Sequence, residues 1–411
     1  MVSNVVIIGT GHAGVQAAAS LREEGFAGTV TLVGDETDFP YHKPPLSKAF
    51  LKEAEPRPQM LRAEAFFAGA GIELRPGVRV EAIDRAARRL ALADGSSLGF
   101  DRLVLATGSR ARALPVPGAD LDGVLSLRSL GDARTLRSRM AQAEDVVVAG
   151  GGFIGLEVAA TLAAAGRRVT VLEAQARVLG RAVAQPISDH VARRLVEAGV
   201  TIRTGVGIER IEGGAAGVEA VVATDGRRIP AQLVLVGIGA VANADLAAAA
   251  GLDVGNGIRV DSRLRSSVPE ILAIGDAALF RHVASGAEVR LESVQNATDQ
   301  AKLAARTITG HDQAYTAVPW FWSDIGDMKL QMAGLAGSSD RIALAGTPED
   351  NRFSLFHYRD GRLTAVESVN RPADHMLARR MLAEGFSPQP EAVGDDLKGQ
   401  FTRWQAARAA A

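Results

Sequence analysis

The chain has 411 residues, of which 46 are basic and 47 acidic, giving a formal net charge of −1. This balance excludes an overall field that would gather nucleic acid or an anionic membrane, so we expect neither as a partner. Cysteine is absent, which excludes disulfides, thiolate-held clusters and thiolate zinc sites. We therefore expect no metal, and any electrons that the protein handles must sit on a bound organic cofactor.

The length exceeds what one hydrophobic core usually fills and predicts two or three domains. No apolar run approaches the roughly 18 residues of a membrane span. A strand pattern begins within a few residues of the first, so we expect no signal peptide, no membrane segment and a cytoplasmic location.

The first motif is NVVIIGTGHAG at residues 4–14. It predicts a buried strand at 5–8, a glycine turn through Gly9, Gly11 and Gly14, and a helix at 15–24. Such a turn presents backbone N–H groups and the positive end of a helix to a pyrophosphate. A second strand at 29–33 precedes Asp35 and Glu36, acids that can bind a ribose hydroxyl. A plain βαβ unit with packing glycines is the alternative.

Further strands are predicted at 72–74, 78–80, 89–92 and 100–106, with Asp94-Gly95 as a hairpin turn. Two prolines at 44 and 45 fix an extended bend before Lys48. A lysine held there suits a flavin or a phosphate, although a solvated lysine is the simpler reading. Thr107 follows a buried strand in a turn of small residues that a nucleotide can approach closely.

The opening pattern restarts 141 positions later, at Gly150 relative to Gly9. A strand at 145–149 leads into Gly150, Gly152 and Gly155, a helix at 156–165 and a strand at 168–172. Two such units predict two bound nucleotides. Glu173, at the end of the second strand, favours NADH because a carboxylate repels a 2′-phosphate, although Arg177 lies nearby in the sequence.

The remaining segments predict a return to the first unit and then a third domain. A helix at 187–198, a strand at 201–203, a hairpin at 224–227 and a strand at 233–236 lead to a turn ending at Gly239 that suits the cofactor. Asp276 follows a strand at 271–274 as a candidate ligand, and it can at the same time be the N-cap of a following helix. From about residue 318, alternating strands, the hairpin Asp360-Gly361 and a helix at 372–383 indicate an α+β domain.

Taken together, the fold class is α/β, with two Rossmann-like dinucleotide-binding domains and a C-terminal α+β domain. The domain predicted to bind the first nucleotide is discontinuous, at residues 1–112 and 240–318. The predicted NAD-binding domain covers 113–239, and the C-terminal domain covers 319–411.

Several motifs resemble those of one family, the FAD-dependent NADH:ferredoxin reductases of glutathione-reductase-like fold that serve oxygenases. They are VVIIGTGHAG, PPLSK, LVLATGSR, VVVAGGGFIGLEVAA, LAIGD, ESVQN, PWFWSD and VNRP. The last three are the most specific, since glycine loops occur in many flavoproteins. The resemblance covers essentially the whole chain and implies FAD and NADH as cofactors.

The resemblance also implies site residues. FAD contacts would be made by Ala13, Asp35 rather than Glu36, Lys48, Val80, Arg128, Asp276 and Val294, with Gly9, Gly11 and Gly14 under the pyrophosphate. The NADH loop would use Gly150, Gly152, Ile154 and Gly155, with Glu173 on the ribose. Glu157 would pair with Lys48 near the flavin, or act only as a helix-dipole partner. Trp320 would line the flavin site, or Trp320 and Trp322 would be core residues.

The activity implied is transfer of electrons from NADH through FAD to a [2Fe-2S] ferredoxin that feeds a cytochrome P450 or a ring-hydroxylating oxygenase. The lack of cysteine excludes the disulfide reductases of this fold. Docking of an acidic ferredoxin would need a local basic surface, for which Arg290, Arg306, Lys329 and Arg371 are candidates. The oligomeric state stays open.

Three alternatives remain from the sequence. Two are enzymes, a rubredoxin reductase and an NADH oxidase. The third is a redox-sensing flavoprotein with slow turnover, resembling apoptosis-inducing flavoproteins.

Overall fold

The computed structural model describes residues 2–410 and divides into two compact units. The first consists of Met1–Pro45, Arg57–Arg110 and Ala240–Ala317. The second consists of Leu46–Pro56, Ala111–Gly239 and Val318–Ala411. The second unit thus holds most of the two regions predicted as the NAD-binding and C-terminal domains, and the three predicted domain boundaries stay a prediction.

A parallel sheet in the order β19-β7-β1-β2-β3 forms the centre of the first unit. Val5 and Ile7 of β1 face one hydrophobic cluster, and Val6 and Ile8 face another. Both faces are covered, which is why β1 is a continuous apolar run. The strands are β1 (Asn4–Ile8), β2 (Thr29–Val33), β3 (Ile72–Arg75), β7 (Arg102–Leu105) and β19 (Ile271–Ala273).

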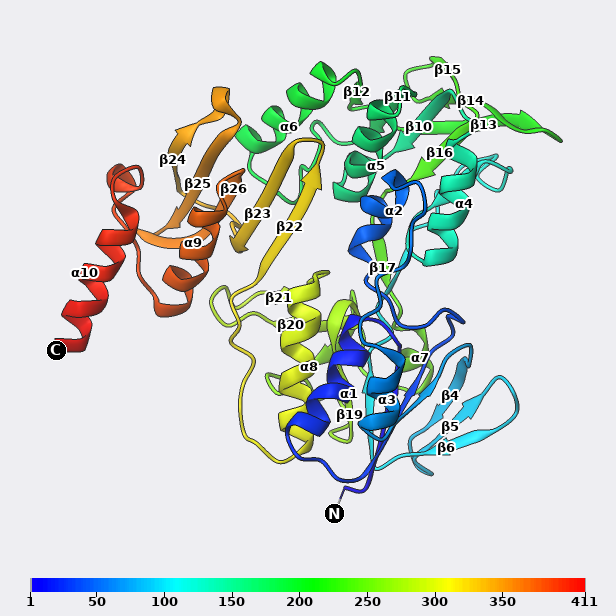
Figure 1. Cartoon of the computed structure of the whole chain (residues 1–411), viewed down its shortest axis with the longest axis vertical. Coiled ribbons are helices and arrows are strands. Elements are labelled where there is room, and N and C mark those ends of the chain that lie inside the picture. Colours follow the sequence, from blue (N-terminus) through cyan, green and yellow to red (C-terminus); the bar gives the residue numbers. More distant parts are fainter. Residues whose placement is uncertain (1, 411) are drawn as a thin grey trace. The chain divides into compact units, whose positions relative to one another are not determined.

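Helices α1 (His12–Glu23) and α8 (Val294–Ile308) lie side by side in this unit (Figure 1). The other elements of the unit are α3 (Glu64–Gly69), β4 (Val80–Asp84), β5 (Arg89–Leu92), β6 (Ser97–Gly99), β8 (Ser109–Ala111), β17 (Ala240–Ala242), α7 (Asp245–Ala249), β18 (Ile258–Val260), η2 (Gly275–Ala277), β20 (Ala278–Arg281) and β21 (Glu288–Val289). The hairpin at Asp94-Gly95 is confirmed between β5 and β6. The strand predicted at 78–80 is wrong, since β4 begins only at Val80. The N–H of Val78, just after the left-handed Gly77 (φ 71°), instead donates to the carbonyl of Gly34.

A second parallel sheet in the order β12-β11-β10-β16-β9 forms one part of the second unit. Its strands are β9 (Val124–Ser126), β10 (Asp145–Ala149), β11 (Arg168–Glu173), β12 (Thr201–Thr204) and β16 (Leu233–Val236). The associated elements are η1 (Pro44–Ser47), α2 (Ala49–Lys52), α4 (Leu130–Met140), α5 (Phe153–Ala164), α6 (Gln185–Glu197), β13 (Ile208–Gly214), β14 (Gly217–Ala223) and β15 (Arg228–Pro230). The predicted hairpin at 224–227 is confirmed between β14 and β15.

An antiparallel sheet in the order β22-β23-β26-β25-β24 completes the second unit. Asp360 and Gly361 both have positive φ, as the tight turn between β25 and β26 requires. The elements are β22 (Trp320–Ile325), β23 (Met328–Gly334), β24 (Arg341–Thr347), η3 (Pro348–Asp350), β25 (Arg352–Arg359), β26 (Arg362–Val369), α9 (Pro372–Glu384), η4 (Pro390–Ala392) and α10 (Leu397–Ala410). The predicted fold class is confirmed by these three sheets.

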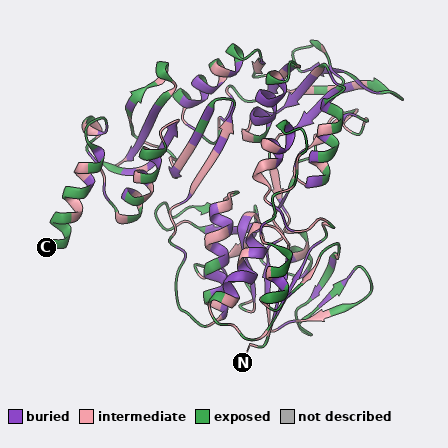
Figure 2. Ribbon diagram, in the orientation of Figure 1, coloured by how far each residue is buried: buried purple, intermediate pink, exposed green. Residues whose placement is uncertain are grey.

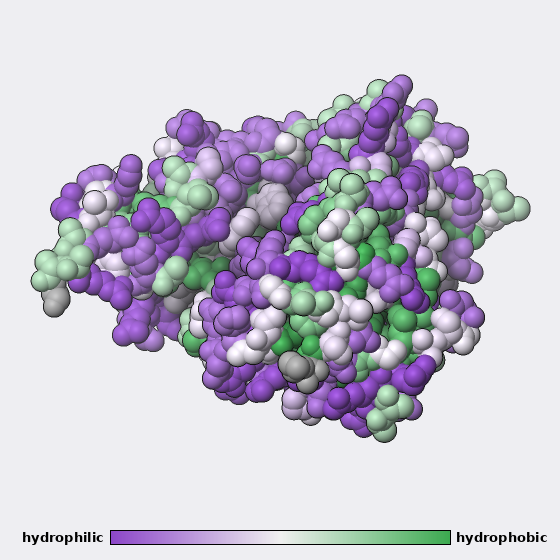
Figure 3. All heavy atoms as spheres, turned by 60° about the horizontal axis from the view of Figure 1, so that its bottom comes forward, coloured by the Kyte–Doolittle hydropathy of each residue, from purple (hydrophilic) through white to green (hydrophobic). Residues whose placement is uncertain are grey.

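Buried residues follow the central strands of all three large sheets (Figure 2). The face drawn in Figure 3 mixes hydrophilic and hydrophobic residues, consistent with a mean hydropathy of +0.08. No helix within residues 2–410 has the length and apolar character needed to cross a membrane.

Candidate functional site

The turn between β1 and α1 is packed tightly against its own backbone at two glycines and is open at the third. A Cβ at Gly14 would lie 1.8 Å from the carbonyl oxygen of Gly9, and one at Gly9 would lie 2.1 Å from that of Ala106. A Cβ at Gly11 would meet nothing within 4 Å. Gly11 is the N-cap of α1, and no side chain caps that helix. This turn therefore fits the pyrophosphate of FAD.

The turn between β10 and α5 repeats the design. A Cβ at Gly155 would lie 2.5 Å from the carbonyl oxygen of Gly150, whereas one at Gly152 would lie 3.8 Å from its nearest neighbour, the carbonyl oxygen of Gly237. Gly152 is the N-cap of α5, again with no side-chain cap. A second nucleotide fits this turn for the same reasons.

The two acids after β2 differ in their surroundings. The Glu36 carboxylate accepts a hydrogen bond from the Tyr41 hydroxyl and pairs with Lys43, whose Nζ lies 2.7 Å from Oε1. Asp35 is exposed and forms no hydrogen bond or ion pair with any of residues 2–410. The geometry therefore favours Asp35 as the ribose ligand, as the family resemblance implies.

Glu173, at the end of β11, supports the second glycine turn. Its Oε2 accepts a hydrogen bond from the Gly151 N–H at 2.7 Å, and its Oε1 accepts one from the Gln175 N–H at 2.7 Å. The Arg177 guanidinium donates to the carbonyls of Gly180 and Val183, both at 2.9 Å. Arg177 is thus committed to its own loop, which strengthens the argument that Glu173 decides between NADH and NADPH.

A buried polar cluster of the second unit surrounds the Glu157 carboxylate on α5. Glu157 is 4% exposed, and its Oε1 lies 2.7 Å from the Lys48 ammonium. Its Oε2 accepts a hydrogen bond from the Ser47 hydroxyl at 2.5 Å, and its Oε1 accepts one from the Ser323 hydroxyl at 2.5 Å. The expected Lys48–Glu157 pair is present, and sequence reasoning missed both serines, although each lies inside a motif quoted above.

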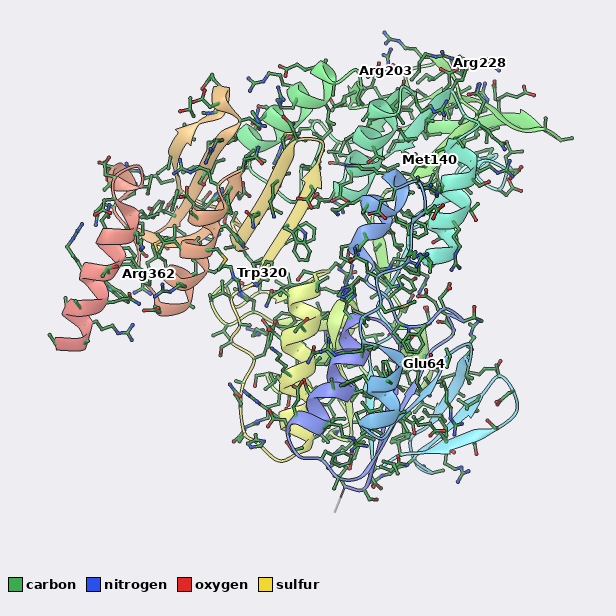
Figure 4. All side chains as sticks on the ribbon, viewed as in Figure 1. Glu64, Met140, Arg203, Arg228, Trp320 and Arg362 are labelled. Carbon is green, nitrogen blue, oxygen red and sulfur yellow. The ribbon has the colours of Figure 1, made fainter. Side chains whose placement is uncertain are left out.

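Trp320 lies at the start of β22 (Figure 4). Its indole contacts Trp322 and His375 with ring centroids 5.6 and 5.7 Å apart, and the Arg379 guanidinium lies 4.2 Å from the ring centroid. It also packs against the core of the antiparallel sheet. Trp320 therefore belongs at least partly to that core, and its role toward a flavin stays a prediction.

The other predicted cofactor residues lie in both units, and their roles stay predictions. In the first unit, Ala13 is buried in α1, Val80 begins β4, Val294 begins α8, and Thr107 donates to the carbonyl of Asn243 at 2.7 Å. In the second unit, Ile154 is 42% exposed on α5, the Arg128 N–H donates to Asp132 at 2.9 Å, and Gly239 has φ 106°.

Asp276 is not the N-cap of a following helix, so that reading is wrong. It lies in the short 3-10 turn η2, which leads directly into β20. Its Oδ2 accepts a hydrogen bond from the Ser109 hydroxyl at 2.9 Å. The ligand reading is the one that remains open.

The candidate docking residues are less free than the sequence indicates. The Arg290 side chain is only 8% exposed and pairs with Glu292 at 2.6 Å, which excludes it from a docking surface. Arg306 pairs with Glu24, and Arg371 pairs with Asp374. Lys329 is exposed. No group of three or more His, Asp or Glu within residues 2–410 could hold a metal ion.

Two glycine turns of one design, each between a parallel strand and a helix, define a protein that can bind two nucleotides. Residues 3–301 match the pyridine nucleotide-disulphide oxidoreductase family, and residues 320–398 match the reductase C-terminal family. The chain therefore belongs to the pyridine nucleotide-disulphide oxidoreductase family, and the predicted membership is confirmed.

Two curated relatives are similar over nearly the whole chain. Rhodocoxin reductase of Rhodococcus erythropolis is 46% identical, over 97% of this chain and 95% of that protein. Putidaredoxin reductase CamA of Pseudomonas putida is 42% identical, over 96% of this chain and 94% of that protein.

Two solved structures have a similar fold. The ferredoxin reductase for the CYP199A2 system from Rhodopseudomonas palustris has a TM-score of 0.94 and 46% identity, covering 97% of this chain and 100% of that chain. The reductase in the covalent putidaredoxin reductase–putidaredoxin complex has a TM-score of 0.94 and 41% identity, covering 98% and 99%.

Proposed function

We propose that this protein is an NADH-dependent ferredoxin reductase that contains FAD and serves a cytochrome P450 or a ring-hydroxylating oxygenase. The observation that carries the proposal is the pair of nucleotide-binding turns in a chain without cysteine. Two nucleotides sharing one protein supply an electron donor and an electron carrier. Without a cysteine pair, the electrons leave the carrier directly for an external acceptor.

FAD supplies the redox chemistry, because it accepts two electrons from NADH and can release them one at a time. The protein's part is to bind and orient. Gly9, Gly11 and Gly14 hold the FAD pyrophosphate and Asp35 its ribose, while Gly150, Gly152 and Gly155 hold NADH with Glu173 on its ribose. Lys48 and Glu157 set the charge that the reacting ring meets.

The relatives support the partner. Besides the rhodocoxin and putidaredoxin reductases, the ferredoxin–NAD(+) reductase component of the anthranilate 1,2-dioxygenase system of Burkholderia cepacia is 40% identical over 97% of this chain. A [2Fe-2S] ferredoxin is therefore the proposed acceptor. The proposal includes a cytoplasmic location, where NADH is available. A rubredoxin is the second candidate acceptor, because rubredoxin-NAD(+) reductase of Pseudomonas putida is 40% identical over 90% of this chain.

The test is to measure reduction of [2Fe-2S] ferredoxins and rubredoxins encoded in the same genome by the FAD-loaded protein. NADH and NADPH are compared, with flavin absorbance followed in parallel without acceptor. We expect fast NADH-dependent reduction of one ferredoxin and slow oxidation in air. Rapid oxidation in air without transfer to any ferredoxin would indicate an NADH oxidase. A reduced flavin that persists in air and transfers to no acceptor would indicate a redox sensor.

A further inference from the structure

Strand β22 of the antiparallel sheet runs along helix α5, and two contacts fix their register. The rings of Phe321 and Phe153 have centroids 4.8 Å apart, and the Ser323 hydroxyl donates to Glu157 at 2.5 Å. Positions 153 and 157 share one face of a helix, and positions 321 and 323 share one face of a strand. The pairing therefore places Ser323 against Glu157 by geometry rather than by a single flexible contact.

The network around Glu157 is almost closed to solvent. Ser323 is 0% exposed and Ser47 is 6% exposed. The serines approach different carboxylate oxygens, since Ser47 donates to Oε2 and Ser323 to Oε1. Oε1 is also the atom that contacts the Lys48 ammonium at 2.7 Å. Together the two hydroxyls fix the rotation of the carboxylate and the position of the oxygen that holds Lys48.

Lys48 needs this support because its side chain is 20% exposed and can reach water. A long lysine side chain has many rotamers, and a rotating carboxylate would hold it poorly. Removing the Ser47 or the Ser323 hydroxyl would leave the Lys48–Glu157 ion pair in place, but the Lys48 ammonium would occupy a wider range of positions. The difference matters only if the Lys48 charge acts on a bound group.

We propose that Ser323, together with Ser47, is a positioning residue that fixes the Lys48–Glu157 pair for the reduction of FAD by NADH. The C-terminal sheet then contributes a side chain, Ser323, to the redox step. This inference rests on the proposed function, because it requires FAD and NADH to meet the Lys48 charge.

The experiment compares Ser323→Ala with Ser323→Thr, which keeps the hydroxyl, and with Ser368→Ala as a matched control. Ser368 is a buried serine of the same sheet, 1% exposed, and its hydroxyl accepts a hydrogen bond from Ser354 instead. We expect Ser323→Ala to lower the limiting rate of flavin reduction by NADH about tenfold, the size of one lost hydrogen bond to a charged group. The dissociation constant for NADH should change less than about twofold.

A second readout needs no NADH. The midpoint potential of the bound FAD, measured by reductive titration with a reference dye, should shift to more negative values in Ser323→Ala. It should stay unchanged in Ser323→Thr and Ser368→Ala. A looser Lys48 stabilises the negative charge of the reduced cofactor less well, which gives the sign.

Unchanged rate and potential in folded Ser323→Ala would overturn the inference, as would equal losses in Ser368→Ala. If Ser323→Ala does not fold, Ser47→Ala tests the same carboxylate from its other oxygen, with the same expected results. Failure of the proposed function looks different. In that case the wild-type protein reduces no ferredoxin, while the potential shift in Ser323→Ala still decides the role of the serine.

Discussion

The two glycine turns share one backbone design, but the helices that follow them carry different side chains at one equivalent position in their first two turns. With the offset of 141 positions, Gln16 on α1 corresponds to Glu157 on α5. Gln16 is half-buried, and its amide donates to the Ser20 hydroxyl at 3.0 Å within the same helix. Glu157 is buried and binds Lys48 together with two serines. The backbone of the two turns is therefore the same, whereas the side chain at this position differs, as a half-buried amide after the first turn and a buried, ion-paired carboxylate after the second.

The neighbours of the two helices explain the difference. Helix α1 packs along α8 through small buried residues such as Ala17 and Ala18. Helix α5 packs against β22, which supplies the Ser323 hydroxyl. The buried Glu157 carboxylate is therefore held by hydrogen bonds as well as by its ion pair with Lys48.

The largest effect is expected from closing either turn. Gly14→Ala would force a Cβ to within 1.8 Å of the Gly9 carbonyl oxygen, so we expect a loss of at least about 3 kcal/mol in unfolding free energy and no bound FAD. Gly155→Ala, with its Cβ 2.5 Å from the Gly150 oxygen, should keep FAD and lose reduction by NADH. FAD content, denaturant unfolding and flavin reduction are the measurements.

Gly11→Ala is the control for both, because its Cβ meets no protein atom within 4 Å. That variant should fold normally and bind FAD more weakly, since the methyl group occupies the cofactor's approach. Equal loss of FAD in Gly155→Ala and Gly14→Ala would show that the two turns do not bind separate nucleotides.

The next effect separates Glu157 from Gln16. Glu157→Gln leaves the Lys48 ammonium without its counter-ion, and breaking a buried pair costs about 3 to 5 kcal/mol when both partners are buried. Because Lys48 is partly exposed, we expect about half of that, together with a roughly 30-fold slower flavin reduction. Gln16→Glu, at the half-buried equivalent position, should change neither. Stopped-flow reduction and denaturant unfolding check both variants, and an unaffected rate in Glu157→Gln would remove Glu157 from the redox site.

Another effect appears only in acid and concerns the stability of the second unit. His375 is 2% exposed, and burial, aided by Arg379 and Lys329, lowers its pKa from 6.5 to about 4. As the pH falls below 6.5 the unfolded chain binds a proton that the folded chain does not, so stability is lost between pH 6.5 and about 4. The full loss is about 3 kcal/mol. His375→Phe should lose less unfolding free energy than the wild type between pH 7 and pH 4.5, as measured by denaturant unfolding at both pH values. An equal loss in the two proteins would contradict the assignment.

Much of the fold could be predicted because buried parallel strands and glycine turns leave strong local patterns. The strand at 29–33 is observed at β2 with the same bounds. The helices predicted to begin at 15 and 156 begin earlier, at His12 and Phe153. Their N-caps are Gly11 and Gly152, so no Ser, Thr, Asp or Asn marks the starts in the sequence.

The site was harder to predict because its contacts are distant in sequence. Ser47 and Ser323 lie 110 and 166 positions from Glu157, and no local pattern links them. Ser323 reaches Glu157 only because β22 packs along α5, which is a property of the tertiary fold. The family resemblance predicted the Lys48–Glu157 pair. Only the structure shows that the Ser47 and Ser323 hydroxyls donate to the Glu157 carboxylate.

The smallest effect compares the two ribose acids. The Glu173 carboxylate accepts hydrogen bonds from two backbone N–H groups near its own turn. Asp35 is exposed and forms no hydrogen bond or ion pair within residues 2–410. Glu173→Gln should therefore cost about 1 kcal/mol of stability and also reduce the preference for NADH over NADPH about tenfold. Asp35→Asn should leave stability unchanged and weaken only FAD binding. The ratio of kcat/KM for the two nucleotides decides the case. A Glu173→Gln variant with its preference intact would assign the discrimination to another group, and Arg177 is a poor candidate because its guanidinium is held by two carbonyls.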